Sequence, residues 1–231
     1  MTGARALPTA PLIAFYGDDF TGASASMEVT AFAGLETVLF LSPPSRERLD
    51  AFNSARVIGI AGVARAQSPQ WMDENLPEVY DLLASTGAQI VHYKVCSTFD
   101  SAPHIGSIGR AIDIGSRRFE GWTPMIVADP GMGRYQASGN LFAGAQGSVH
   151  RLDRHPVMSR HPVTPMDEAD LALHLARQTN RKIGLVDFVA IKRGGGCAII
   201  ARPRRWCADH IDRRPRLANL DRGWPPCVAG H

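Results

Sequence analysis

The fold is indicated first by the stretch Phe15-Tyr16-Gly17-Asp18-Asp19-Phe20-Thr21-Gly22, which comes directly after the apolar run Pro11-Leu12-Ile13-Ala14. This order predicts a buried strand that ends in two adjacent carboxylates, followed by a helix over Ala23–Ala33. In an open α/β sheet, ligands bind at the carboxyl ends of the strands, and the N–H groups that begin the next helix attract anions. One short segment therefore offers both an acceptor for hydroxyl groups and a site for an anion.

The adjacent carboxylates Asp18 and Asp19 have two interpretations. Asp and Thr favour helix N-caps and turns, so Asp18, Asp19 and Thr21 fit a purely local role before the helix. The same carboxylates at a strand end also fit catalytic groups, with Thr21 and Gly22 as substrate-binding residues where the helix begins. A short motif by itself does not decide between these roles, and the other motifs of the chain bear on the choice.

Strand-like and helix-like segments alternate along the chain. Short apolar runs rich in Val and Ile are typical of buried parallel strands, and five of them occur here. The alternation predicts an α/β fold, with an open, mainly parallel, doubly wound sheet and flanking helices. The expected strands are Leu12–Tyr16, Thr37–Leu41, Val57–Ala61, Gln89–Tyr93 and Met125–Ala128, and the further helices are Trp71–Ser85, His104–Arg118 and Asp167–Gln178.

The chain changes character towards its C-terminus. Tyr135–Val163 is rich in Gly, His, Arg and Pro and predicts ordered but irregular structure, whereas Ile183–Ile191 predicts a sixth strand. Residues 193–231 hold eight Arg, no Lys and three Asp, without a helical or strand period. This segment fits a disordered basic tail or an out-of-frame translation of a GC-rich gene, and the abrupt change in composition favours the second. We expect one domain over residues 1–192 and an aberrant Arg/Pro-rich tail over 193–231.

The composition is that of an ordinary globular protein, with 45% hydrophobic and 20% charged residues among 231. The net charge of +3 arises in the tail, because residues 1–192 hold 17 basic and 19 acidic residues, which argues against a nucleic-acid-binding surface. No apolar stretch approaches the ~20 residues of a membrane helix, and no signal-peptide core is present, so we expect a cytoplasmic protein and no membrane partner. Free thiols are expected at Cys96, Cys197, Cys207 and Cys227.

A second polar cluster, His92–Ser101, follows the fourth expected strand. It contains Lys94, a fixed positive charge, beside the hydroxyl groups of Ser97 and Thr98, and these groups suit a carboxylate or a phosphate. A surface lysine followed by a Ser/Thr turn is the commoner case for such a stretch. This cluster, however, is expected to share its sheet edge with the paired aspartates, and convergent polar groups define a binding site. We therefore expect Lys94, Ser97 and Thr98 to bind substrate.

A third cluster, Asp129-Pro130-Gly131-Met132-Gly133-Arg134-Tyr135, follows the fifth expected strand. Gly133 permits close approach of the backbone to a ligand, and Arg134 can grip a carboxylate through two parallel hydrogen bonds. The cluster is not a P-loop, because the Gly-Lys-Ser/Thr ending is missing. We expect Gly133 and Arg134 to join the same sheet edge as substrate-binding residues.

A fourth cluster, Arg151–Pro162, carries two His-Pro pairs. No carboxylate or Cys spacing supports a metal site there, so a structural role for His155 and His161 is favoured and no metal ligand is expected. The cations of this segment can reach the sheet edge and close over an anionic ligand. Alternatively, Asp153 and Arg154 can pair internally and stiffen the loop.

Together and in this order, these motifs resemble the N-terminal domain of the four-carbon acid sugar kinase family, which includes 3-oxo-tetronate kinases and threonate/erythronate kinases. The resemblance spans roughly residues 10–192. It rests on the segments Asp18–Ala23, Tyr93–Ser101, Gly133–Tyr135 and Arg151–Met166.

The resemblance implies a domain that binds a sugar acid, while a separate C-terminal domain binds ATP and Mg²⁺ supplies part of the charge stabilisation. Phosphate passes from ATP to a hydroxyl of a tetronate or 3-oxo-tetronate. Carried over to this chain, Asp18 and Asp19 contact substrate hydroxyls, with one of them as base, and Lys94, Ser97 and Arg134 hold the substrate carboxylate. No Gly-rich nucleotide-binding segment follows residue 192, so we expect this chain to lack the site for ATP and Mg²⁺.

Two classes of function follow from this reading. The first is the substrate-binding domain of an ATP-dependent sugar-acid kinase, inactive alone. The alternative is a non-catalytic, truncated sugar-acid-binding module or a pseudogene product, and turnover of ATP separates the two. A phosphatase of the Asp-x-Asp-x-Thr type receives little weight, because Asp18 and Asp19 are adjacent. The expected partner is a small-molecule sugar acid, and a homodimer is left open.

Overall fold

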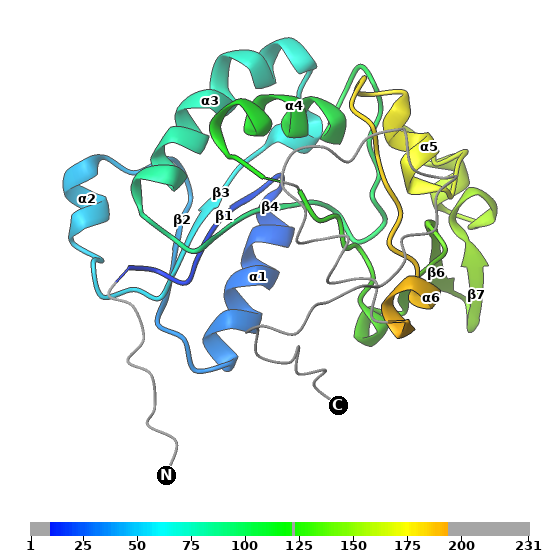
Figure 1. The fold of residues 1–231 in the computed structure, drawn as a ribbon, viewed down its shortest axis with the longest axis horizontal. Helices are drawn as coiled ribbons and strands as arrows, with labels where there is room; N and C mark the ends of the chain where they lie inside the picture. The colour runs from blue at the N-terminus through cyan, green and yellow to red at the C-terminus, as the bar shows by residue number, and fades with distance from the viewer. Residues whose placement is uncertain (1–9, 122, 194–231) are drawn as a thin grey trace, which may run out of the picture.

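The computed structural model describes residues 10–121 and 123–193, and their N-terminal part forms a parallel four-stranded sheet (Figure 1). The strand order is β2-β3-β1-β4. Their bounds are Ile13–Gly17 for β1, Thr37–Phe40 for β2, Val57–Ala61 for β3 and Ile90–Lys94 for β4. The predicted α/β class is confirmed, and the first four expected strands are present where the apolar runs placed them.

Helices cover both faces of this sheet, because successive side chains of a strand point to opposite faces. Helix α1 (Phe20–Phe32) lies on one face, and α3 (Pro69–Ser85) and α4 (Ile108–Arg118) lie on the other (Figure 1). In β1, Phe15 packs with Ala23 of α1, whereas Ala14 and Tyr16 belong to the core under α3 and α4. The sheet is therefore wound on both sides, as expected.

Capping residues set where the helices begin. Ser45 caps the short helix α2 (Arg46–Asp50), and Ser68 caps α3. The expected start of α4 at His104 is wrong, because the side chain of Ser107 accepts a hydrogen bond from Arg110 N at 3.1 Å and the helix begins only after it. In the same way α5 spans Leu171–Ala176, capped by Asp170, and is shorter than expected.

A second, antiparallel sheet follows, so the expectation of irregular structure over Tyr135–Val163 is wrong for its first half. Its strands, in the order β5-β6-β7, are Arg134–Ala137, Asn140–Ala145 and Ser148–Arg151. The two connecting turns, Ser138-Gly139 and Gln146-Gly147, have positive φ at both residues (47° and 83°, 51° and 78°). Such two-residue turns match the twist of a β-hairpin and explain why this glycine-rich segment folds into strands.

This sheet and α5 surround a second core, in which Leu141 of β6, Leu171 of α5 and Phe99 are almost fully buried. The segment that follows β7 packs into the same core through the side chains of Met158 and Met166. Short 3-10 helices complete the connections: η1 (Ala64–Ala66), η2 (Pro130–Met132), η3 (Leu152–Arg154) and η4 (Met158–Arg160).

Two expected strands are wrong. Met125–Ala128 joins no sheet; Met125 and Val127 pack into the second core, and Val127 N donates to the side chain of Gln136 at 3.3 Å. An apolar run of this length indicates burial but does not identify a strand. Ile183–Ile191 is also no strand, because Asp187 accepts a hydrogen bond from Ala190 N and begins α6 (Phe188–Lys192).

No helix within residues 10–121 and 123–193 combines the length and apolar content that are needed to cross a membrane. The expected tail lies outside the described residues from 194 onward, and so do Cys197, Cys207 and Cys227. Cys96 is a free thiol.

Candidate functional site

The carboxyl ends of β1, β3 and β4 lie side by side, and the loops that follow them build the candidate site. Gly17, the last residue of β1, is in register with Ala61 of β3 and Lys94 of β4. A cavity of about 480 Å³ lies at this edge, where open α/β sheets bind their ligands. Its polar lining residues are Asp18, Asp19, Arg65, Asp100, His161 and Thr164.

One guanidinium joins the two adjacent aspartates. Arg65 Nη2 donates to Asp18 Oδ1 at 2.6 Å, and Arg65 Nη1 donates to Asp19 Oδ2 at 2.7 Å. The backbone adds a third link, because Arg65 N donates to the Asp18 carbonyl oxygen at 3.0 Å. Arg65 follows β3 in the 3-10 helix η1, so this link crosses from β3 to β1 and fixes the geometry of both carboxylates.

Burial makes the carboxyl of Asp18 a weaker acid than an ordinary aspartic acid. The residue is 2% exposed, and burial raises the pKa of its carboxyl from 3.8 to about 6, against the opposing hydrogen bond and charge of Arg65. Burial alone would lower the pKa of Arg65, but the hydrogen bond and charge of Asp18 outweigh it and hold that pKa above its usual range. Asp18 thus exchanges a proton slightly below neutral pH, beside a permanent cation.

Asp19 combines the local role and the site role that the sequence left open. Its Oδ1 accepts a hydrogen bond from Gly22 N at 2.7 Å and caps α1, while its Oδ2 accepts from Arg65. Thr21 and Gly22 form the first turn of α1 and do not line the cavity. A Cβ on Gly22 would lie 2.7 Å from Asp19 Oδ1, so glycine permits the tight cap.

In the cluster after β4, one residue lines the cavity and others contact residues that line it. Thr98 Oγ1 donates to Asp100 Oδ1 at 2.8 Å, and only Asp100 lines the cavity. Lys94 Nζ donates to the Val95 carbonyl oxygen at 2.5 Å, and a Cβ on Gly22 would lie 3.5 Å from the same Nζ. The ammonium of Lys94 therefore lies against the first turn of α1, close enough to lower the pKa of Asp18.

Ser97 and Cys96 lie in the same turn as Thr98. Ser97 is half-buried and does not line the cavity. Cys96 Sγ lies 3.1 Å from Thr98 Oγ1, and burial raises the pKa of this thiol, which makes it a weak nucleophile. None of the three predicted residues of this cluster, Lys94, Ser97 and Thr98, lines the cavity. Lys94 and Thr98 instead interact with the lining residues Asp18 and Asp100.

Gly133 and Arg134 do not reach this cavity. Gly133 ends η2 with φ of 68°, and Arg134 begins β5 in the second sheet. Arg134 Nη1 donates to the carbonyl oxygens of Met132 at 3.1 Å and Gly133 at 3.4 Å. Their expected place at the edge beside Asp18 depended on a strand over Met125–Ala128, and the four-stranded sheet does not contain it.

Arg65 and Asp100 contribute to the cavity and were missed, and the turn that carries His161 and Thr164 was predicted to reach the sheet edge only as one of two alternatives. Arg65 follows the end of β3 by four residues, so the rule that strand ends share one edge could have found it. Asp100 stands in the quoted cluster after β4 without an assigned role. The segment of His161 was expected to close over the sheet edge, and His161 does line the cavity.

The described carboxylates do not form a metal site. Within residues 10–121 and 123–193, no group of three or more His, Cys, Asp or Glu side chains is placed to hold a metal ion. Asp18 and Asp19 both form ion pairs with Arg65, which offsets part of their negative charge. We therefore derive no chemical step through Mg²⁺ from these residues.

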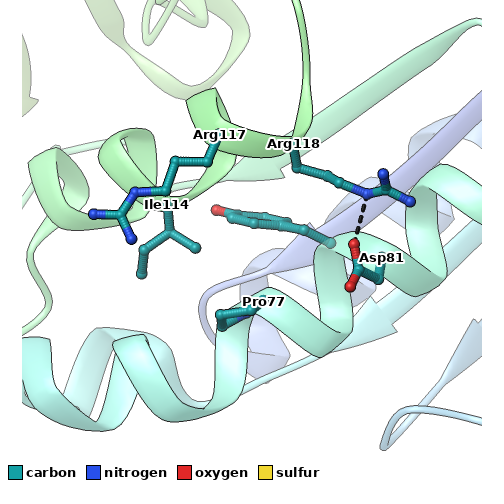
Figure 2. A pocket seen from close by; sticks show the side chains of 6 residues that line it. Pro77, Asp81, Ile114, Arg117 and Arg118 are labelled. Carbon is teal, nitrogen blue, oxygen red and sulfur yellow. Dashed lines mark ion pairs between the residues drawn. The ribbon is translucent and has the colours of Figure 1, made fainter.

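A second, smaller hollow of about 210 Å³ lies between α3 and α4 (Figure 2). Arg118 Nε lies 2.5 Å from Asp81 Oδ1 at this hollow, and the Tyr80 hydroxyl donates to the Ala111 carbonyl oxygen at 3.1 Å. Three of its polar side chains thus bind within the protein, and no predicted site residue lines it. The cavity at the sheet edge is therefore the candidate site.

The chain is similar to known proteins over most of its length. Residues 13–210 match the model of a family described as a sugar-binding N-terminal domain. A 3-oxo-isoapionate kinase of Paraburkholderia graminis is 54% identical over 208 residues, which cover 90% of this chain and 44% of the relative. A 3-oxo-tetronate kinase of Methylobacterium radiotolerans is 35% identical over 187 residues, which cover 80% of this chain and 42% of the relative.

A solved structure of a Salmonella typhimurium LT2 protein shares the fold, with a TM-score of 0.69 and 25% identity over 81% of this chain and 44% of that chain. The chain spans less than half the length of the relatives it matches. The family match runs past residue 192 to residue 210, into a part that the structure does not describe. With a sugar-binding family model matched from β1 onward and relatives named as kinases, the chain belongs to the sugar-binding N-terminal domain family of the four-carbon acid sugar kinases.

Proposed function

We propose that this chain is the substrate-binding domain of an ATP-dependent kinase and that it binds a sugar acid, a tetronate or a 3-oxo-tetronate, in the cavity at the sheet edge. One observation carries the proposal: the buried carboxyl of Asp18, paired with Asp19 through Arg65, lines a cavity at the carboxyl ends of the strands. Ionised carboxylates accept hydrogen bonds from hydroxyl groups, as a polyol requires. The relatives' names, 3-oxo-isoapionate kinase and 3-oxo-tetronate kinase, support an oxo acid as ligand.

Asp18 is the proposed base and Asp19 the proposed hydroxyl anchor. With a pKa of about 6, Asp18 is mostly ionised at pH 7, yet it accepts a proton more readily than an ordinary carboxylate. Asp19 is held by the cap of α1 and by Arg65, so its carboxylate has a fixed orientation toward a substrate hydroxyl. Phosphoryl transfer depends mainly on positioning and charge stabilisation, and such fixed groups supply the positioning.

The proposed kinase also needs a nucleotide site, which we place in the part of the relatives that this chain does not match. We propose residues 1–192 as the sugar-acid domain and 193–231 as a separate tail, of which the family model also matches the part up to residue 210. We also propose that the kinase reaction takes place in the cytoplasm, because ATP is supplied there. The alternative function, a non-catalytic module that only binds a sugar acid, uses the same cavity and differs in lacking ATP turnover.

Calorimetric titration of the chain with D-erythronate, D-threonate and L-threonate, and then with ATP and Mg²⁺, tests the proposal. We expect sugar-acid binding to the wild-type chain and at least tenfold weaker binding to Asp18→Asn. His104→Asn, an exposed change outside the lining residues, is the matched control. Binding of ATP without any sugar acid would place the nucleotide site in this domain and contradict the proposal. Absence of all binding by a folded sample would favour a remnant without ligand.

A further inference from the structure

His161 enters the cavity from a rigid turn. The turn is anchored on both sides by Met158 and Met166, which are buried in the second core, and Met166 N donates to the Met158 carbonyl oxygen at 2.9 Å. His161 N donates to the same carbonyl at 3.2 Å. The imidazole of His161 is thus presented to the cavity by the second sheet's core rather than by a free loop.

Hydrogen bonds fix which nitrogen of His161 carries the proton. Thr164 N donates to His161 Nδ1 at 3.0 Å, and Thr164 Oγ1 lies 2.9 Å from the same atom. A backbone N–H can only donate, so Nδ1 must be the unprotonated acceptor. In the neutral imidazole, this arrangement leaves the proton on Nε2.

A comparison with His155 shows that the Nε2 proton of His161 is available to a ligand. His155 Nδ1 likewise accepts backbone hydrogen bonds, from Val157 N at 3.2 Å and Met158 N at 3.1 Å. The His155 ring, however, also bonds the backbone of Gly144, so both of its nitrogens are used within the fold. His161 Nε2 has no hydrogen-bond partner among the residues that the structure describes, and His161 lines the cavity.

The other polar residues that line the cavity indicate which group of a ligand the Nε2 proton of His161 can bind. Asp18, Asp19 and Asp100 can accept but not donate when ionised. The guanidinium of Arg65 donates from both terminal nitrogens to Asp18 and Asp19, so it lies directly against these two carboxylates, and its Nε is buried without a partner. A sugar acid has hydroxyl donors at one end and a carboxylate, which can only accept, at the other. The carboxylate of the ligand is repelled by the aspartates that bind Arg65, whereas the Nε2 donor of His161 makes no hydrogen bond to a described carboxylate and lies in the same lining.

We propose that His161 Nε2–H donates to the carboxylate of the bound sugar acid, so that the hydroxyl end of the ligand lies at Asp18 and Asp19. This inference rests on the proposed function. It moves the carboxylate contact from Lys94, Ser97 and Arg134, which lie outside the cavity lining, to a residue of the lining. It also makes His161 a specificity-determining residue that selects acids over the corresponding polyols.

Paired titrations with D-erythronate and erythritol test the role of His161. His161→Asn keeps an acceptor near the Nδ1 position for Thr164 N but removes the Nε2 donor. We expect the Kd for D-erythronate to rise roughly 10- to 100-fold and the Kd for erythritol to stay unchanged. His104→Asn is the control and leaves both constants unchanged. Equal weakening of both ligands, or no weakening of either, would overturn the inference.

The tautomer can be measured without any variant. In a long-range ¹H–¹⁵N spectrum of the wild-type chain, we expect His161 Nδ1 to show the signal of an unprotonated nitrogen and Nε2 to shift when D-erythronate is added. A protonated Nδ1, or an Nε2 signal that does not respond to bound ligand, would refute the role of His161. Failure of the wild-type chain to bind any sugar acid would instead refute the proposed function, so the two failures are distinct.

Discussion

Arg65 Nη2 lies 2.6 Å from Asp18 Oδ1, and yet burial keeps the pKa of that carboxyl raised to about 6. The Asp18 side chain is 3% exposed and the Arg65 side chain 22% exposed, so the pair lies at the boundary between core and cavity. Desolvation of the carboxylate outweighs the attraction of the guanidinium. The pair thus holds a carboxylate that is both fixed in place and ready to take up a proton.

Removal of Arg65 is expected to destabilise the protein. Arg65→Met keeps the aliphatic stem but removes both charged hydrogen bonds, leaving Asp18 buried without its partner. We expect the free energy of unfolding to fall by about 3 kcal/mol at pH 7, at the low end for a broken buried pair because Asp18 can protonate instead. Urea denaturation followed by circular dichroism measures the change.

An exposed ion pair on the same protein provides the control for Arg65. Arg110 also makes two 2.6 Å hydrogen bonds, to Asp73, but these side chains are 30% and 39% exposed. Solvent screens such a pair, so Arg110→Met should cost less than about 1 kcal/mol. Equal losses for the two variants would mean that the Arg65 pair stabilises the fold no more than a surface pair does.

Stability should depend on pH through Asp18. The pKa of this carboxyl is 3.8 in the unfolded chain and about 6 in the folded protein, so between these values the folded protein binds the proton more tightly. The contribution of Asp18 to stability is therefore fully present below pH 4 and is lost as the pH rises through 6, by roughly 3 kcal/mol. Asp18→Asn removes this dependence.

The difference between wild type and Asp18→Asn isolates this effect from other groups. Burial lowers the pKa of His174, so His174 acts in the opposite direction and destabilises the fold as the pH falls below 6.5. Because His174 is present in both proteins, its effect cancels in the difference. A difference in unfolding free energy that stays constant between pH 4 and pH 7 would contradict the raised pKa of Asp18.

The sequence was sufficient to predict the parallel sheet and the edge at which Asp18 and Asp19 lie. Its strands are continuous apolar runs, and a run such as Val57–Ala61, buried at every position, has few other ways to fold. It was not sufficient for the second sheet, because β5 to β7 are only partly buried and carry little apolar signal. There the turns Ser138-Gly139 and Gln146-Gly147 were the better indicators, since both residues of each turn need positive φ.

The composition of the site was harder to predict than its location. Asp18 and Asp19 are adjacent in the chain, and their position after a strand was enough to place them at this edge of the sheet. Arg65 is 46 residues from Asp19, and its role depends on the packing of β3 beside β1. For Arg134 the predicted location was wrong. Its glycine-arginine motif follows an apolar run that was expected to be a strand of the parallel sheet, and that run is not part of the sheet.

Close packing of β1 on α1 should make Gly17 intolerant of a side chain. A Cβ on Gly17 would lie 2.6 Å from Ala23 Cβ and 2.9 Å from Ala23 Cα, so the start of α1 must move away from the sheet. We expect Gly17→Ala to cost about 1–3 kcal/mol of stability and to weaken sugar-acid binding, since Asp18 and Asp19 lie at this junction. Gly184→Ala, which meets no atom within 4 Å, is the control in the same denaturation and titration assays.

The two oxygens of Asp19 allow its cap and its site role to be separated. Oδ1 caps α1 through Gly22 N, and Oδ2 binds Arg65. Asp19→Ser keeps a good N-cap acceptor but loses the carboxylate, so its free energy of unfolding should stay within about 1 kcal/mol of the wild-type value. Asp19→Ala also loses the cap, which should lower the free energy of unfolding by about a further 0.5–2 kcal/mol. Both variants should bind D-erythronate at least tenfold more weakly if Asp19 anchors a substrate hydroxyl. Wild-type affinity in Asp19→Ser would show that the carboxylate serves the fold alone.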